Sequence, residues 1–235
     1  MSRFIAITSL FFFGFAAVFL IQQPEKLTEI RGLVSKAVSY KSVPSPPAWL
    51  STWPPKLNQR YPDLVLENQD GEPMELSDLL GTPFLVELVA VPCKGCQAFA
   101  GANRVGDFAG MGTQVGLDSI DEYAKQYGGV ELGRDIPFVQ VLLYASDMAA
   151  PTRQETHDWA EHFGMQTSQD RYVLRGLDAM LDPETQGLIP GFQLIDEDFR
   201  LRFDSSGHAP QHDLYRELLP AIKGLLNQSP RSQVR

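Results

Sequence analysis

The strongest constraint on the fold is a short apolar segment that ends at two cysteines. The run FLVELVAV, residues 84–91, lies between Pro83 and Pro92, and its length and composition favour a central strand buried on both faces. Cys93 and Cys96 follow at once and are the only cysteines of the 235-residue chain. The sequence therefore predicts a Cys-x-x-Cys motif where a buried strand ends.

Strands and helices are expected to alternate around this segment. Two short strands, 64–67 and 72–76, are predicted to pair across an Asp70-Gly71 turn, and a helical turn before Gly81 follows them. Further along, the patterns predict a helix over 116–129, a strand over 137–146, a helix over 151–164, two strands over 191–203 and a helix over 212–227 with a break at Pro220. This order predicts an α/β fold with helices on the faces of a sheet.

The N-terminal segment is expected to interact with a membrane. Phe4–Ile21 is an uncharged, mostly apolar run that would extend about 27 Å as a helix, close to the thickness of a bilayer core. Because the cleavage pattern after it is poor, residues 1–23 are interpreted as a signal anchor, with a cleaved signal peptide or a buried helix as alternatives. Residues 24–61 are expected to form a helical and proline-rich linker, 62–228 the folded domain, and 229–235 a polar tail.

Charge and cysteine content narrow the classes of function. The formal net charge is −9, and no run of lysine and arginine offers a surface for nucleic acid, so nucleic-acid binding is set aside. Two cysteines spaced as one pair suit an exported protein, although a cytosolic protein remains an alternative.

Redox chemistry is the favoured role of the cysteine pair. At the start of a helix the first sulfur is exposed to unpaired backbone N–H groups that stabilise a thiolate, and Lys94 is expected to favour that thiolate further. A zinc site would need ligands from the histidines, of which only His208 and His212 have a helical i, i+4 spacing. A structural disulfide would close a very small loop and add little stability, and a pair of inert thiols is the blandest interpretation.

The sequence around the motif resembles one family. The stretch PDLVLENQDGEPMELSDLLGTPFLVELVAVPCKGC, from Pro62, is similar to the opening of the TlpA/redoxin branch of the thioredoxin superfamily, and IPGFQLIDEDFRLRF, from Ile189, is similar to its cis-proline loop and closing hairpin. This resemblance, which extends to about Asn227, implies a thioredoxin-like central mixed sheet flanked by helices. It also implies disulfide exchange at the strand–helix junction, with no cofactor.

The resemblance assigns roles to four residues. It makes Cys93 the attacking thiolate, Cys96 the resolving thiol, and Pro190 the cis-proline that faces the two sulfurs. Glu87 matches a buried acidic position that takes the proton of the resolving cysteine. Strand alternation places Glu87 on one face with Val89 and Val91 but does not give its depth, so a solvent-facing Glu87 remains an alternative.

The chain also departs from the family pattern. Pro92 and Lys94-Gly95 replace the usual residues around the first cysteine, so the redox potential does not follow from the motif. Five glycines between residues 101 and 116 predict that the helix after the cysteines is short and is followed by a mobile loop, which either recognises a partner or is a simple insertion.

The favoured function is therefore a membrane-anchored thiol-disulfide oxidoreductase acting on protein cysteines outside the cytoplasm, more as a reductant than an oxidant. Its expected partners are protein thiols or disulfides, a membrane or periplasmic redox protein, and the inner membrane through the N-terminal helix. A Sco-like copper-binding domain is one alternative. That family has a histidine just before the LID strand, whereas the corresponding stretch here contains Pro190 and no histidine. A thiol peroxidase is another, although Ala90 stands where peroxiredoxins have a threonine.

Overall fold

The computed structural model describes residues 47–228. The predicted membrane run, most of the predicted linker and the tail 229–235 lie outside these residues. Among the helices of 47–228, none has the length and apolar composition needed to cross a bilayer.

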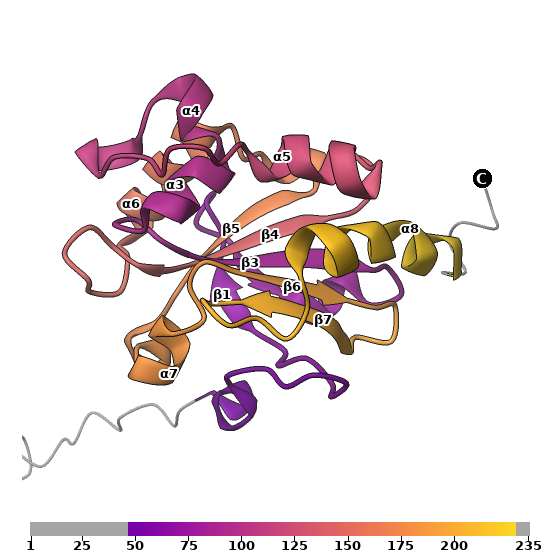
Figure 1. Cartoon of the computed structure of the whole chain (residues 1–235). Coiled ribbons are helices and arrows are strands. Elements are labelled where there is room, and N and C mark those ends of the chain that lie inside the picture. Colours follow the sequence, from indigo (N-terminus) through magenta and orange to yellow (C-terminus); the bar gives the residue numbers. More distant parts are fainter. Residues whose placement is uncertain (1–46, 229–235) are drawn as a thin grey trace, which may run out of the picture. The chain divides into compact units, whose positions relative to one another are not determined.

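A five-stranded mixed sheet forms the centre of the described domain (Figure 1). Its order is β5-β4-β3-β6-β7, where β3 pairs in parallel with β4 and antiparallel with β6, β4 and β5 are parallel, and β6 and β7 are antiparallel. The strands are β3 Phe84–Ala90, β4 Phe138–Tyr144, β5 Arg171–Arg175, β6 Gly191–Ile195 and β7 Leu201–Ser206. All seven residues of β3 are buried, which confirms the central strand predicted before the cysteines.

The helices that follow β3 and β4 lie on the same face of the sheet (Figure 1). Both β3-to-β4 and β4-to-β5 are parallel steps in one direction, and right-handed crossovers place their helices on one side. The first crossover contains α3 Lys94–Ala100, α4 Ala102–Val105, η3 Phe108–Gly110, α5 Ile120–Tyr123 and η4 Ala124–Gly128, and the second contains α6 Arg153–Phe163 and η5 Thr167–Gln169. At the end of the chain, the π-helical turn η7 Leu214–Leu218 leads into α8 Leu219–Gln228, which packs against η4.

The opposite face is covered by the start of the described chain. Tyr61 packs edge-on against Phe84 and Phe199, and Trp49 is buried in the same core. Within the proline-rich part of the predicted linker, η1 Ala48–Thr52 is a 3-10 helix. Trp53 donates its indole N–H to Thr185, which lies in the short helix α7 Pro183–Gln186 after η6 Asp178–Met180. Residues 47–61 therefore pack on the domain through aromatic side chains.

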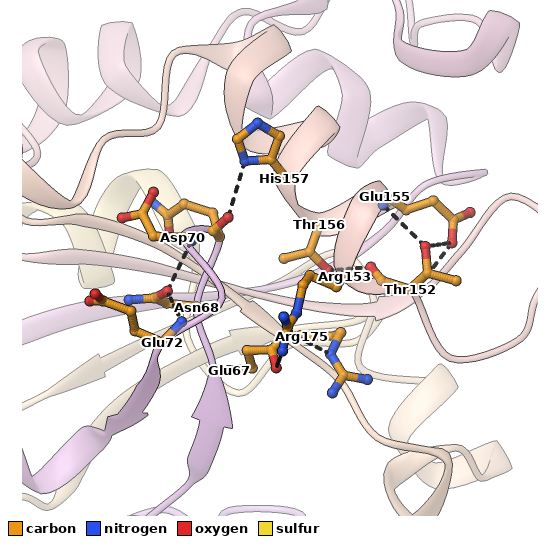
Figure 2. Close-up of polar contacts among 11 residues, drawn as sticks. Glu67, Asn68, Asp70, Glu72, Thr152, Arg153, Glu155, Thr156, His157 and Arg175 are labelled. Atoms are coloured by element: carbon orange, nitrogen blue, oxygen red, sulfur yellow. Dashed lines mark hydrogen bonds and ion pairs between the residues drawn. The ribbon is translucent and has the colours of Figure 1, made fainter.

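The predicted hairpin is present and covers the free edge of β5. β1 Val65–Glu67 and β2 Pro73–Glu75 are antiparallel and lead into η2 Leu76–Leu79, and the nearby Gln69 amide bonds to the β5 backbone at Arg171 O (2.9 Å) and Val173 N (2.8 Å). Figure 2 shows how Glu67 holds the start of α6: Arg153 donates to both of its carboxylate oxygens, and Arg175 of β5 lies 3.5 Å from one of them. The two Gln69 hydrogen bonds satisfy backbone groups that the edge strand β5 would otherwise expose.

Most predicted elements are confirmed, and the differences have local causes. Gly164 ends α6 in the left-handed region, as expected (φ 67°). The helix predicted over 116–129 begins only at Ile120, where the Ser119 side chain accepts the Glu122 N–H, and it continues as a π-helical turn. The break expected at Pro220 coincides with the change from η7 to α8.

Candidate active site

Cys93 is the N-cap residue of α3, immediately after the central strand. Its sulfur accepts a hydrogen bond from the backbone N–H of Cys96 at 3.1 Å. The helix ends after seven residues because Gly101 adopts a left-handed conformation (φ 107°), which confirms the prediction of a short helix. The turn thus holds the two cysteines together at one end of the sheet.

The two sulfurs lie in different environments. Cys93 is half-buried and Cys96 is fully buried, and both are free thiols. Hydrogen bonds from the Cys96 side chain and from the backbone N–H groups of Cys96 and Gly95 lower the pKa of Cys93 to about 7, although burial opposes this. Burial, the hydrogen bond with Cys93 and the charges of Cys93 and Glu87 raise the pKa of Cys96. At pH 7, about half of Cys93 is therefore thiolate, whereas Cys96 keeps its proton.

Lys94 was expected to favour the Cys93 thiolate, but it does not lower the pKa of Cys93. The groups that lower the pKa of Cys93 are hydrogen-bond donors at the start of α3, and Lys94 is not among them. Its side chain is exposed and extends toward Gly112, where an added Cβ would lie 3.7 Å from Lys94 Cε. The reactive form of Cys93 therefore depends first on the hydrogen bond from the Cys96 side chain, and then on backbone N–H groups, rather than on the neighbouring cation.

Glu87 is completely buried, so the solvent-facing alternative is wrong. It lies in the middle of β3 beside Gln140 of β4, whose side-chain amide donates to Glu87 Oε2 at 2.7 Å. Burial raises the pKa of Glu87 to about 8, and the charge of Cys93 adds to this, whereas the Gln140 hydrogen bond lowers it. Glu87 therefore holds a proton at neutral pH and can exchange it near that pH.

Pro190 lies beside the first turn of α3. The Ile189–Pro190 peptide bond is cis, as the resemblance implies. A Cβ built on Gly95 would lie 3.5 Å from Pro190 Cγ and 3.8 Å from Cys93 Sγ. The structure thus brings Pro190 next to the cysteine pair, although nearly 100 residues separate them in the sequence.

The glycine-rich segment 106–116 lies against the same turn. The buried side chain of Gln97 in α3 donates to the carbonyls of Val91 (2.7 Å) and Phe108 (3.3 Å) and accepts the Phe108 N–H (2.8 Å). Farther along, Gln114 N–H donates to Lys94 O at 3.0 Å, and Gln114 Oε1 lies 3.3 Å from the Cβ position of Gly95. The segment is therefore fixed to α3 at two points, one on each side of Gly110 and Gly112.

Two residues of the site were not predicted from the sequence. Gln140 bonds to Glu87, and Trp159 of α6 donates its indole N–H to Gln140 Oε1 at 2.9 Å. A signal for Gln140 is present, because it is the one amide in the otherwise apolar strand FVQVLLY, as Glu87 is the one acid in FLVELVA. Trp159 carries no comparable signal, since a tryptophan on the apolar face of a helix usually belongs to the core.

Three of the four histidines considered as metal ligands have other contacts. His157 Nδ1 lies 3.2 Å from the Gln69 carbonyl, His162 Nε2 lies 2.9 Å from the Gly106 carbonyl, and His212 Nδ1 accepts the Asp204 N–H. Within residues 47–228, no three histidine, cysteine, aspartate or glutamate side chains are grouped so that they could hold a metal ion. No histidine therefore joins the cysteines as a third ligand in this part of the chain.

Comparison with known proteins yields likeness to solved structures alone. No family model matches the chain, and no curated protein does. A SCO1/SenC family lipoprotein of Bacillus anthracis is 19% identical over 72% of this chain and 96% of its own, with a TM-score of 0.47. A thioredoxin-like protein of Porphyromonas gingivalis is 16% identical over 74% of this chain and 95% of its own, with a TM-score of 0.43.

A third similar structure is BsSco, a member of the Sco family of cytochrome c oxidase assembly proteins. It is 13% identical over 72% of this chain and 95% of its own, with a TM-score of 0.47. All three TM-scores are below 0.5, so these likenesses assign no role to the site.

Proposed function

We propose that this protein is a thiol-disulfide oxidoreductase that exchanges electrons with protein cysteines through Cys93 and Cys96. The observation that carries this proposal is the asymmetry of the pair. One sulfur is half-exposed with a pKa lowered to about 7, and its neighbour three residues on is fully buried with a raised pKa. Such a pair provides a nucleophile and a protonated thiol in reserve.

The reaction with a substrate disulfide has two steps. The Cys93 thiolate attacks one substrate sulfur, a bond forms between the two sulfurs, and the first substrate thiolate leaves. Cys96 then loses its proton and attacks Cys93 Sγ, which forms the Cys93–Cys96 disulfide and releases the second substrate thiolate. Two electrons pass from the cysteine pair to the substrate, and the leaving thiolates take up protons from water.

Glu87 and Pro190 act on different parts of this cycle. Glu87, with its pKa raised to about 8, is the acceptor for the Cys96 proton, because its charge already influences the Cys96 thiol across the interior. Pro190 lies beside Gly95 and Cys93 and borders the position at which a substrate chain approaches the exposed sulfur. Both roles agree with those that the sequence resemblance implies.

We place the domain outside the cytoplasm, held to the inner membrane by the apolar run Phe4–Ile21, with a membrane or periplasmic redox protein as its electron partner. The composition of that run and the single cysteine pair support this location. The reducing direction rests on the resemblance to the TlpA/redoxin branch.

The test uses serine variants of the two cysteines in the full chain. Cys93→Ser should abolish dithiothreitol-driven reduction of insulin, because no nucleophile remains at the exposed position. Cys96→Ser should also stop turnover, yet it should accumulate a mixed disulfide at Cys93 that non-reducing gels and mass spectrometry detect. Unchanged insulin reduction by Cys93→Ser would exclude the proposed function.

A further inference from the structure

Gln140 occupies a special place beside the acid of the proposed site. It is the direct neighbour of Glu87 in the parallel pairing of β3 and β4, and only 1% of its surface is exposed. Its Nε2 donates to Glu87 Oε2 at 2.7 Å, while burial removes competing water. A buried amide of this kind fixes the orientation of the carboxyl group that it faces, because neither side chain can turn to solvent for another hydrogen bond.

Trp159 determines which way the Gln140 amide points. An indole N–H only donates, and Trp159 Nε1 donates to Gln140 Oε1 at 2.9 Å. The indole is itself fully buried and held between the rings of Phe108 and Phe163, at centroid distances of 5.6 and 4.6 Å. If the amide were flipped, its NH₂ group would face the indole N–H, which is donor against donor, and its oxygen would face Glu87 Oε2, which is acceptor against acceptor. The NH₂ group therefore faces the carboxyl group.

The orientation makes the two oxygens of Glu87 unequal. Oε2 accepts from an NH₂ group that offers no acceptor, so a proton on Oε2 would find no acceptor in Gln140 and would weaken Oε2 as the acceptor of that hydrogen bond. Oε1 is buried and accepts no hydrogen bond from residues 47–228. The exchangeable proton of Glu87 therefore belongs on Oε1, where it leaves the Gln140 contact intact.

Several charged groups act on this carboxyl group from the surrounding elements. Cys93 of α3 and Asp121 of α5 raise its pKa and Arg171 of β5 lowers it, while the charge of Glu87 in turn raises the pKa of Cys96 in α3. Gln140 is the one hydrogen-bond donor among the groups that shift the pKa of Glu87. Its removal would therefore leave burial unopposed by any hydrogen bond.

We propose that Gln140, oriented by Trp159, is a positioning residue of the redox site that assigns the exchangeable proton of Glu87 to Oε1. This inference rests on the proposed function. In the resolving step, the Cys96 thiol gives its proton to Glu87 Oε1, the Cys96 thiolate attacks Cys93 Sγ, and the bond between Cys93 and the substrate sulfur breaks. The released substrate thiolate carries the electron pair of the broken bond.

The experiment compares Gln140→Met with Gln193→Met in the full chain. Gln193 is a matched control because it is also a fully buried glutamine, lies on β6, and bonds to Tyr61 on the opposite face of the sheet. The reduced protein is mixed with an equimolar amount of an aromatic disulfide whose thiolate is coloured. The colour appears in two phases, the first from attack by Cys93 and the second from attack by Cys96. Infrared titration of the Glu87 carboxyl band, assigned with Glu87→Gln, measures its pKa in the oxidised protein.

Gln140→Met should raise the pKa of Glu87 measured by infrared titration. The pH at which the rate of the second phase rises should increase with it. The second phase at pH 7 should slow by about tenfold, the factor of one pKa unit, because less carboxylate is present to accept the Cys96 proton. The first phase should be unchanged, and Gln193→Met should change neither the second phase nor the Glu87 titration.

Two results would overturn the inference: no shift of Glu87 in Gln140→Met, or equal shifts in both variants, which would indicate general loosening of the core. If Gln140→Met does not fold, Trp159→Phe is the second variant, because it removes the indole N–H that orients Gln140 and keeps an aromatic ring in the core. It should also raise the pKa of Glu87, and an unchanged pKa in this variant would refute the inference. If the wild-type chain exchanges no disulfide while Gln140→Met still shifts Glu87, the proposed function fails but the control of the carboxyl group by Gln140 stands.

Discussion

Glu87 is a carboxyl group fully enclosed in the middle of the central strand, and this placement has a thermodynamic cost. In the folded protein it keeps its proton up to about pH 8, whereas its ordinary pKa is 4.5. Between these values the unfolded chain binds fewer protons than the folded chain, so stability falls as pH rises through this window. The acid thus destabilises the domain under the conditions in which it can act as a base.

We expect Glu87→Gln to remove this pH dependence. In the oxidised protein the cysteines do not titrate, and the charge of Cys93 no longer raises the pKa of Glu87. The advantage of the variant in unfolding free energy should therefore grow from about pH 5 to a limit below about pH 8, with a slope approaching 1.4 kcal/mol per pH unit. Urea unfolding at a series of pH values measures this. Glu161→Gln, at an exposed position of α6, is the control and should run parallel to the wild type. A parallel curve for Glu87→Gln would contradict the burial of an ionisable carboxyl group at this position.

At the residue scale, the sequence predicted the parts of the site that lie on one segment. Glu87, six residues before Cys93, was singled out by the family resemblance, and the strand pattern left its depth open. Pro190 could be predicted only through the family resemblance, because no local pattern shows which loop approaches a distant helix. Gln140 was missed because its role depends on the register between β3 and β4, and neither strand alone encodes that register.

At the scale of elements, α3 and the glycine-rich segment behave as one unit because of Gln97. This buried side chain fills three hydrogen-bonding positions, two at Phe108 and one at Val91. It links the end of β3 to the segment that follows α4. The predicted loop is thus attached to the same turn that carries the cysteines.

Gln97→Leu should release this segment. The substitution leaves the Phe108 N–H and the Val91 carbonyl without their partner, and we expect a loss of about 2 kcal/mol in unfolding free energy. Hydrogen exchange of the amides between residues 106 and 116 should accelerate more than exchange in β4. Gln126→Leu, at an exposed position of η4, is the control. Unchanged exchange in residues 106–116 would show that Gln97 does not hold the segment.

The strand β5 illustrates why an element can be missed. It begins and ends with Arg171 and Arg175, so its five residues lack the apolar run that predicts β4. In the structure these arginines reach Asp121, at 2.7 Å, and Glu67, at 3.5 Å, which come from other elements. Charges on an edge strand are favourable only after these partners are in place, and the sequence alone does not show which partners they are.

At the scale of the whole domain, one hydrophobic core includes both the strands of the sheet and residues near the N-terminal end of the described chain. Trp49, which is 6% exposed, and Tyr61 belong to the same core as the strands. A proline-rich composition predicts that residues 47–61 form no long helix. It does not predict that an aromatic side chain of this segment packs into the core of the domain. Residues 47–61 therefore contribute to the stability of the domain that carries the cysteines.

Trp49→Ala in the full chain should lower the free energy of unfolding by about 3 kcal/mol, because a buried indole is lost and a cavity remains. Insulin reduction at 25 °C should persist, since Trp49 packs on the face of the sheet opposite α3. Val115→Ala is the control, because Val115 is 96% exposed and its truncation should change stability by less than about 0.5 kcal/mol. Equal denaturation midpoints for Trp49→Ala and the wild type would show that residues around Trp49 do not contribute to folding.

The burial of Glu87 also isolates its proton from bulk water. One of its oxygens accepts a hydrogen bond from Gln140, and the other is buried without a hydrogen-bond partner among residues 47–228. A proton on Glu87 can therefore reach solvent only after a neighbouring group takes it up or after the core opens transiently. The charge of Cys93 raises the pKa of Glu87, so oxidation of the cysteine pair, which removes that charge, lowers the affinity of the protein interior for a proton.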